Sequence, residues 1–362
     1  MQPFDPLKMM PKPYAGNIVR HTEEITQWLA RTPREQALEP ELPIIDAHHH
    51  LWDVRAVANR YLLQDLLCDI NQGHNICATV YVEGHAMYRN TGPDHMKPVG
   101  EVEFANGNAA MAVSGVYGKC RVAEAIVGHA DLMLGCAVRE VLEAQLAAAG
   151  GRLRGIRYAT PYDASELINK FMSRPVPPHR LSDPAFREGF AQLARFGLSF
   201  DAWLYHPQLP DLLALARDFA ESPIVVDHVG TVLGVGPYAG HQQEELQRCK
   251  NDLLDLAACP NVSLKIGGLG MPVFGLGLHE RELPPSSEEL ARAWRPYVEM
   301  CIEIFGAGRC MFESNFPVDK QSCGYSELWN AFKRLTATCT AAERTALFSG
   351  TAARVYRMAS VV

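Results

Sequence analysis

Three histidines follow a short apolar run in Pro43-Ile44-Ile45-Asp46-Ala47-His48-His49-His50-Leu51-Trp52-Asp53. The apolar residues at 43–45 predict a buried strand that runs directly into the histidines. Because side chains alternate between the two faces of a strand, His48 and His50 point one way and His49 the other. Two imidazoles on one face at the end of a strand can bind a metal ion or polarise a reacting carbonyl group. A surface histidine tract is the alternative, but a tag is longer and lies at a terminus.

The bulk composition is that of an ordinary globular protein. The chain has 362 residues, of which 48% are hydrophobic and 21% charged. This length suits one large α/β barrel as well as two smaller domains. The formal net charge of -7 argues against nucleic acid or an anionic membrane surface as a partner. The expected partner is therefore a small-molecule substrate.

The distribution of cysteines and prolines predicts a cytoplasmic protein. The ten cysteines are scattered without a C-x-x-C pair, which is typical of buried thiols in a reducing compartment. The first 14 residues contain four prolines and no apolar core, unlike a signal peptide. No stretch approaches the ~18 apolar residues of a membrane span.

Short apolar runs alternate with helical patterns from residue 43 onward. The predicted strands are Ile44–Ala47, Ile76–Val82, Ala123–Val127, Leu153–Tyr158, Leu198–Trp203, Ile224–Asp227, Val262–Ile266 and Cys310–Glu313. The predicted helices include Val138–Ala149, Pro184–Phe196, Leu209–Ala220, Glu244–Ala258, Ser287–Phe305 and Tyr325–Ala337. Eight such strand–helix units predict an α/β fold with a parallel sheet closed into a (β/α)₈ TIM barrel. A doubly wound open sheet is the alternative, although no G-x-G-x-x-G follows the first strand.

Three segments stand outside this regular pattern. Residues 1–42 form an N-terminal extension to a barrel over residues 43–362, and an amphipathic helix is predicted within Asn17–Arg31. That helix is expected to pack on the barrel or on a partner subunit, which leaves a homodimer open. The connections Met87–Lys119 and Gly267–Pro285 are long, rich in glycine and proline, and leave the C-terminal ends of strands two and seven. Long loops at this face are usually functional, so the first is predicted as a lid, with a mobile surface excursion as the alternative.

Polar residues gather where the predicted strands end, which is the face at which barrels place their active sites. They are His48 and His50, Glu83 and His85, Arg154 and Arg157, Tyr205, Asp227 and His228, Lys265, and Glu313 and Asn315. Among them, Glu83, His85 and Tyr205 are candidates for substrate binding. Arg154 and Arg157 lie three residues apart, so only one of them is expected to line a pocket.

The order of these motifs resembles the amidohydrolase superfamily, and within it the amidohydrolase-2 branch that includes lactonases of 2-pyrone-4,6-dicarboxylate and of sugars. The motifs that carry the resemblance are IIDAHHHLWD, LRGIRY, IVVDHVG, NVSLKIGGL, SNFP and LFSGTAARVYRM, between about Ile44 and Met358. It implies that His48, His50 and His228 orient an electrophile or bind a metal. It also implies that Arg154, Arg157 and Lys265 are candidate contacts for an anion or a carbonyl group.

One position departs from the family pattern. The aspartate that takes a proton from water at the end of strand eight is replaced by Asn315, and an amide has no useful basicity. The amide can still orient a water molecule. Glu313 lies two residues earlier on the same face and is predicted to have taken over the role of base, with Asp319 as a weaker candidate. Alternatively, Glu313 forms a buried ion pair with Lys265 or an arginine.

The metal requirement stays open at this level. Zinc takes four ligands, and without a carboxylate the sequence offers it only three, His48, His50 and His228. The resemblance includes lactonases that work without metal, so we expect either no tightly bound metal or one divalent ion, zinc or manganese.

The predicted function is a hydrolase that opens the lactone of a small carboxylated molecule while the three histidines stabilise the oxyanion. The alternatives are a metal-dependent non-oxidative decarboxylase of an aromatic or unsaturated acid, and a barrel that binds a ligand without turning it over.

Overall fold

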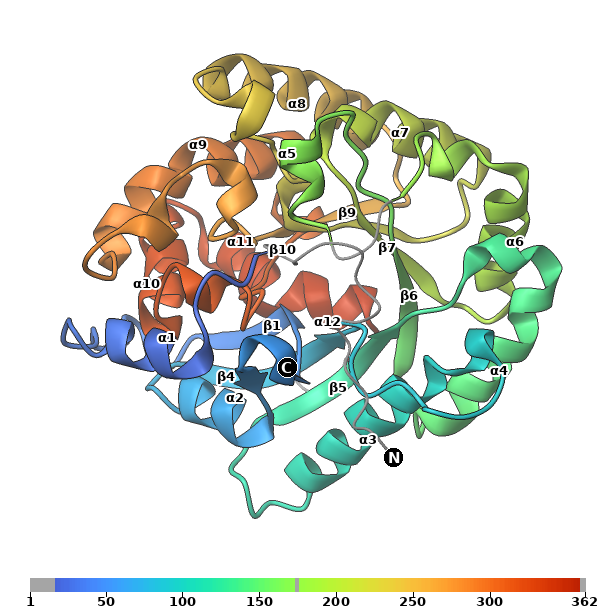
Figure 1. The fold of residues 1–362 in the computed structure, drawn as a ribbon. Helices are drawn as coiled ribbons and strands as arrows, with labels where there is room; N and C mark the ends of the chain where they lie inside the picture. The colour runs from blue at the N-terminus through green and yellow to red at the C-terminus, as the bar shows by residue number, and fades with distance from the viewer. Residues whose placement is uncertain (1–16, 173–175, 359–362) are drawn as a thin grey trace.

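Eight parallel strands form a nearly closed barrel in the computed structural model, which describes residues 17–172 and 176–358 (Figure 1). They are β1 (Pro43–His49), β4 (Asn75–Val82), β5 (Arg121–Gly128), β6 (Leu153–Ala159), β7 (Ser199–Trp203), β8 (Ile224–Val226), β9 (Val262–Ile266) and β10 (Cys310–Phe312). Neighbours in this order are hydrogen-bonded, and a parallel bridge between His49 and Phe316 joins the end of β10 to β1. All eight predicted strands are confirmed, and with them the (β/α)₈ barrel.

The main helices surround the barrel. They are α2 (Leu63–Ile70), α3 (Val99–Val113), α4 (Val138–Ala148), α6 (Pro184–Arg195), α7 (Leu209–Asp218), α8 (Gln242–Ala257), α9 (Ser287–Phe305) and α10 (Tyr325–Leu335). Shorter helices are α1 (Thr22–Leu29), α5 (Glu166–Asn169), α11 (Ala341–Thr345) and α12 (Thr351–Val355). The six helices predicted between strands are confirmed to within a few residues at each end.

The predicted lid over Met87–Lys119 is wrong for its second half. Residues 99–113 form helix α3, which packs against β5 and α4 as one of the regular outer helices. Its glycines and asparagines have low helix propensity, but buried Val102 and Ala105 anchor it to the barrel, so tertiary packing overrides that propensity. Only the part before α3 reaches the mouth of the barrel.

A short antiparallel pair that the sequence did not predict follows the first strand. β2 (Trp52–Val54) pairs with β3 (Asn59–Tyr61). The Trp52 ring stacks on His50, with ring centroids 5.4 Å apart, and its Nε1 donates to Asn59 Oδ1 at 2.7 Å. The pair therefore holds an aromatic wall beside the histidines of β1.

Apolar side chains fill the barrel interior away from the strand ends that carry the histidines. This cluster includes Ile45, Ala47, Ala78, Val80, Val82, Ala125 and Val127, with Ala352, Tyr356 and Met358 from the C-terminal segment. Its members are buried, so this end supplies stability and leaves polar chemistry to the opposite end.

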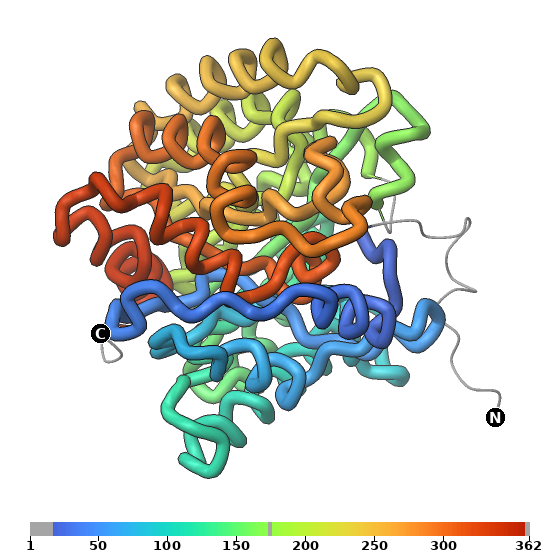
Figure 2. Tube along the Cα trace, turned by 90° about the vertical axis from the view of Figure 1, so that its left-hand side faces the viewer, coloured from blue at the N-terminus to red at the C-terminus, as the bar shows by residue number. Residues whose placement is uncertain are grey.

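The described part of the N-terminal segment lies against the barrel of its own chain (Figure 2). Trp28 Nε1 donates to the Arg281 carbonyl at 3.0 Å, and the Ser287 amide donates to Glu35 Oε1 at 2.8 Å. Residues 1–16 of the predicted extension lie outside the described residues. Among the described helices, none has the length and apolar character needed to cross a membrane.

Candidate active site

The two outer histidines of the β1 motif share one face, as strand alternation predicts. His48 Nε2 and His50 Nε2 lie 3.1 Å apart, whereas His49 Nε2 lies 2.8 Å from Thr79 Oγ1. All three rings are buried. The pair formed by His48 and His50 therefore points into the top of the barrel, and His49 helps to hold the strands together.

His228 joins this pair from the turn after β8. Its ring centroid lies 4.6 Å from that of His48, and its backbone φ of 54° places it in the left-handed region. His228 Nδ1 lies 2.6 Å from Glu313 Oε1, and His48 Nδ1 lies 3.0 Å from Glu313 Oε2. One carboxylate thus fixes two imidazoles, and we call His48, His50, His228 and Glu313 the enclosed cluster.

A hydrogen bond to the backbone sets the tautomer of His50. The Val82 carbonyl can only accept, so His50 Nδ1, at 2.8 Å, must carry the hydrogen and Nε2 is bare. Burial is the main cause that lowers the pKa of His48, and the positive charge of Lys265 lowers it further. Burial is also the main cause that lowers the pKa of His50, and the neighbouring His48 adds to this effect. Both rings are therefore neutral at pH 7.

Glu313 stays ionised inside the barrel. Burial raises the pKa of its carboxyl group, but His228 and His48 outweigh that effect and hold the pKa at about 2. Its side chain is fully buried behind the two rings. Glu313 is therefore placed to act through His228, and its ion pairs are with histidines instead of the predicted Lys265 or arginine.

A buried ammonium group lies directly behind His48. Lys265 Nζ is 2.7 Å from Asp201 Oδ2, 3.0 Å from Asp227 Oδ1 and 3.3 Å from His48 Nδ1. Burial lowers the pKa of Lys265, but Asp201 and Asp227 raise it above its usual value, so the group remains charged. The Tyr356 hydroxyl completes this network by donating to Asp201 Oδ2 at 2.6 Å.

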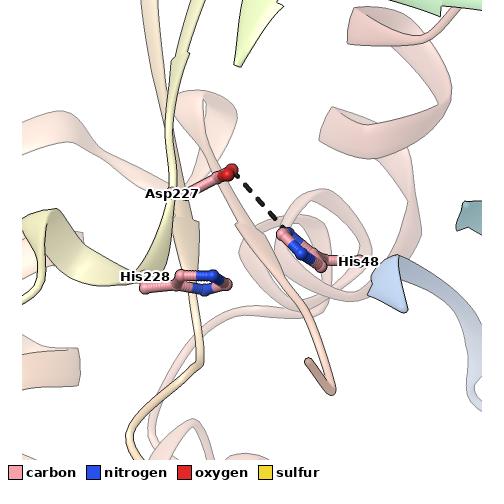
Figure 3. A group of neighbouring side chains, drawn as sticks. All are labelled: His48, Asp227 and His228. Atoms are coloured by element: carbon pink, nitrogen blue, oxygen red, sulfur yellow. Dashed lines mark ion pairs between the residues drawn. The ribbon is translucent and has the colours of Figure 1, made fainter. Parts of the chain in front are cut away.

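Two neighbouring cations oppose a divalent ion at His48, Asp227 and His228. The donor atoms of His48, Asp227 and His228 lie within 4.8 Å of one another, and Figure 3 shows the ion pair between His48 and Asp227 with His228 beside them. Lys265, however, already lies against both His48 and Asp227. On the other side of His48, Arg157 Nη1 lies 3.3 Å from Nε2 and 3.7 Å from Asp227 Oδ2. Two fixed cations thus hold the positions next to His48 and repel a dication.

Two adjoining cavities open above the cluster. The smaller one, of about 90 Å³, is lined by His50, His228 and Asn315, and the larger one, of about 520 Å³, contains Glu83 in its wall. Three side chains line both cavities: His85, Arg157 and Trp203. Arg157 therefore presents its positive charge to both spaces.

The carboxylates of Glu83 and Asp319 fix the positions of two polar side chains that line the cavities, Arg157 and Asn315. Arg157 Nε donates to Glu83 Oε1 at 2.7 Å, and Arg157 Nη2 donates to the Glu83 carbonyl. Asn315 Nδ2 donates to Asp319 Oδ1 at 2.9 Å, while the Gly270 amide donates to Asp319 Oδ2 at 2.8 Å. Burial raises the pKa of Asp319 to about 7. One Nδ2 hydrogen is used in this way, so Asn315 keeps its oxygen and its second Nδ2 hydrogen to orient a molecule in the smaller cavity.

Three residues predicted to bind substrate lie elsewhere. Arg154 Nε donates to the Tyr356 carbonyl at 2.8 Å, because a residue three places before Arg157 faces away from the pocket. Tyr205 lies in the apolar layer between strands and helices, because the chain turns away after β7 ends at Trp203. Lys265 is fully buried and lines neither of the two cavities.

The sequence interpretation missed two side chains of this face. Trp203, the last residue of β7, lines both cavities, and His129, directly after β5, lines the larger one. The rule that polar residues at strand ends build barrel sites points to His129, but the strand was predicted to end two residues earlier. Trp203 carries no such signal, since an aromatic residue at a strand end is usually core.

Comparison with known proteins identifies the family. The family model described as Amidohydrolase matches residues 45–358. The chain is 33% identical to an uncharacterized protein, y4mH, of Sinorhizobium fredii, over 88% of this chain and 99% of that protein. It is 27% identical to an L-fucono-1,5-lactonase of Burkholderia multivorans, over 87% of this chain and 96% of that enzyme.

A solved structure agrees with this result. An amidohydrolase from Burkholderia multivorans with bound zinc superposes with a TM-score of 0.63 at 25% identity, covering 87% of this chain and 99% of that one. The chain belongs to the amidohydrolase family, and it is a hydrolase.

Proposed function

We propose that this enzyme opens the lactone ring of a small carboxylated molecule by attack of water. The observation that carries the proposal is the pairing of His228 with the buried Glu313 at the floor of the smaller cavity. The similarity to L-fucono-1,5-lactonases supports a cyclic ester as the substrate class.

His228 is the base in this proposal. Its Nδ1 donates to Glu313, so the neutral ring carries its lone pair on Nε2. Nε2 accepts the proton of the attacking water, and the carboxylate of Glu313 stabilises the imidazolium that forms, as in other His–carboxylate pairs. The imidazolium then gives this proton to the alkoxide oxygen that leaves when the C–O bond of the ring breaks. The family's strand-eight aspartate is then not needed, because a histidine performs its step and Asn315 orients the water.

Arg157 stabilises the negative charge that develops on the ring carbonyl oxygen. It is the cation that lines both cavities, and its two contacts with Glu83 fix its position before the substrate binds. A preorganised charge of this kind favours the transition state over the ground state. The larger cavity holds the rest of the substrate, and Arg180 in its wall is placed to pair with a carboxylate.

A lactone panel tests the proposal. L-fucono-1,5-lactone and 2-pyrone-4,6-dicarboxylate are offered to the purified protein, and acid release is followed at constant pH. We expect turnover of at least one lactone, and loss of that turnover in His228→Asn. Release of CO₂ from an aromatic acid without lactone opening would favour the decarboxylase alternative, and binding without any turnover would favour the non-catalytic one.

A further inference from the structure

A second group of metal-binding side chains lies in the wall of the larger cavity. Glu83 follows β4, His85 comes two residues later, and His129 follows β5. Their ligand atoms all lie within 4.8 Å of one another. We call these three residues the open cluster, because His85 and His129 are partly exposed and all three line the cavity.

The two carboxylate oxygens of Glu83 have different surroundings. Arg157 Nε donates to Glu83 Oε1, whereas Oε2 is buried and accepts no hydrogen bond from any described residue. The nearest ionisable partner of Oε2 is His85 Nδ1, at 3.4 Å. A buried carboxylate oxygen without a donor is costly, and a bound cation satisfies it.

His129 is oriented as metal-ligating histidines usually are. Its Nδ1 lies 3.2 Å from the Arg157 carbonyl, which can only accept, so Nδ1 carries the hydrogen. Nε2 is then the ring atom left to bind a metal ion. A backbone carbonyl that fixes the tautomer in this way is the common outer partner of a histidine ligand.

Charge balance also favours a cation at this end of the barrel. Its buried carboxylates include those of Glu83, Asp201, Asp227 and Glu313, and its buried cations include those of Arg157 and Lys265. Glu101 and Asp319 are buried at this end as well, and burial raises their pKa to about 8 and about 7. The histidines His48 and His50 are neutral, so they do not offset the excess of negative charge. One divalent ion provides the missing positive charge, since a buried charge requires compensation.

We propose that Glu83, His85 and His129 bind one divalent metal ion of the zinc class, with the remaining coordination position open to the larger cavity. Two imidazoles and one carboxylate are a ligand set that zinc uses where it keeps a position for water or substrate. This site differs from the predicted one at His48, His50 and His228, because Lys265 and Arg157 both contact His48 there, whereas among the described residues Arg157 is the cation bonded to Glu83 here. It does not rest on the proposed lactone chemistry.

Metal binding to the full chain tests this site without any substrate. The chelator-stripped protein is titrated with Zn²⁺, and with Co²⁺ so that the visible absorption of the bound ion reports its ligands. His129→Phe and His85→Phe remove the nitrogens but keep a ring against Tyr158 and Tyr88. His95→Asn is the matched control, because His95 lines the same cavity outside the cluster.

We expect one equivalent of Zn²⁺ to bind to the wild type. Loss of an outer partner alone costs about 10–100-fold in metal affinity, so each ligand variant should weaken binding by more than about 100-fold. His95→Asn and His228→Asn should stay within about twofold of the wild type. The proposal is overturned if the wild type binds no Zn²⁺, or if binding survives both phenylalanine variants and is lost in His228→Asn.

The two proposals fail separately. A protein that binds zinc through His129 but opens no lactone refutes the proposed function alone. A protein that opens lactones and binds no zinc refutes the metal site alone. Thermal unfolding of each variant shows whether the fold is retained, and His85→Phe keeps the test valid if His129→Phe does not fold.

Discussion

The enclosed cluster and the open cluster contain similar residues and share Arg157 as a neighbour, yet their other surroundings give them different chemistry. In the enclosed cluster, Lys265 and Arg157 lie against His48, and Glu313 takes up the two Nδ1 atoms. In the open cluster, Glu83 Oε2 lies 3.4 Å from His85 Nδ1, and the cavity gives access to solvent. The charges beside the histidines and their access to solvent, more than the number of histidines, decide whether a cluster transfers protons or binds a metal ion.

The largest effect is expected at Lys265, whose buried charge distinguishes the enclosed cluster from the open one. Replacing it with methionine in Lys265→Met leaves Asp201 and Asp227 without their buried cation, and breaking such a pair costs about 3–5 kcal/mol. We therefore expect the free energy of unfolding in urea to fall by about that amount. Lys250→Met is the control, because that pair with Glu303 is solvent-exposed and should change stability by less than about 1 kcal/mol. Equal effects of the two substitutions would show that Lys265 does not neutralise the interior.

His228 tests the chemistry assigned to the enclosed cluster. Loss of a general base typically lowers the rate by about 10²–10⁴-fold, so kcat of His228→Asn on its best lactone should fall by about 10³-fold. KM should change little, because the ring acts on water. His179→Asn, a change at an exposed histidine, should leave both constants unchanged. A loss of less than about tenfold in His228→Asn would remove His228 from the role of base.

Glu313 gives the enclosed cluster a pH dependence that the exposed carboxylates lack. Its pKa is about 2 in the folded protein and 4.5 as the reference value, so the folded state binds its proton less readily. Its contribution to stability is present above about pH 4.5 and is lost as the pH falls toward 2. Between about pH 5 and about pH 3, the wild type should lose roughly 2 kcal/mol more unfolding free energy than Glu313→Gln. Glu303→Gln, at an exposed site, should follow the wild type.

The smallest effect on activity is expected at Arg154, on the strand that also carries Arg157. Arg154→Met removes hydrogen bonds to the carbonyls of Tyr356, Gly151 and Leu153, which should cost about 1–2 kcal/mol of stability. Its kcat/KM should stay within about twofold of the wild type, whereas Arg157→Met should lose most of its activity. Similar losses of activity in the two variants would contradict the placement of only Arg157 at the cavities.

The local pattern of the sequence was enough to predict the barrel. Apolar runs bounded by polar residues located all eight strands, because a buried parallel strand requires continuous apolar side chains. Alternation along β1 also placed His48 and His50 together and His49 apart. Helix α3 was missed because its glycines and asparagines disfavour a helix, and only its contacts with β5 and α4 stabilise it.

The sequence by itself therefore determined the family, the barrel and most of the polar residues at its catalytic face. Only the tertiary structure decided which charge lies beside which ring. Lys265, Asp227 and Glu313 come from three different strands or strand ends, and their distances to His48 decide whether it is a ligand or a hydrogen-bonding partner. Electrostatic interactions depend on separation and burial, and neither quantity can be read from spacing along the chain.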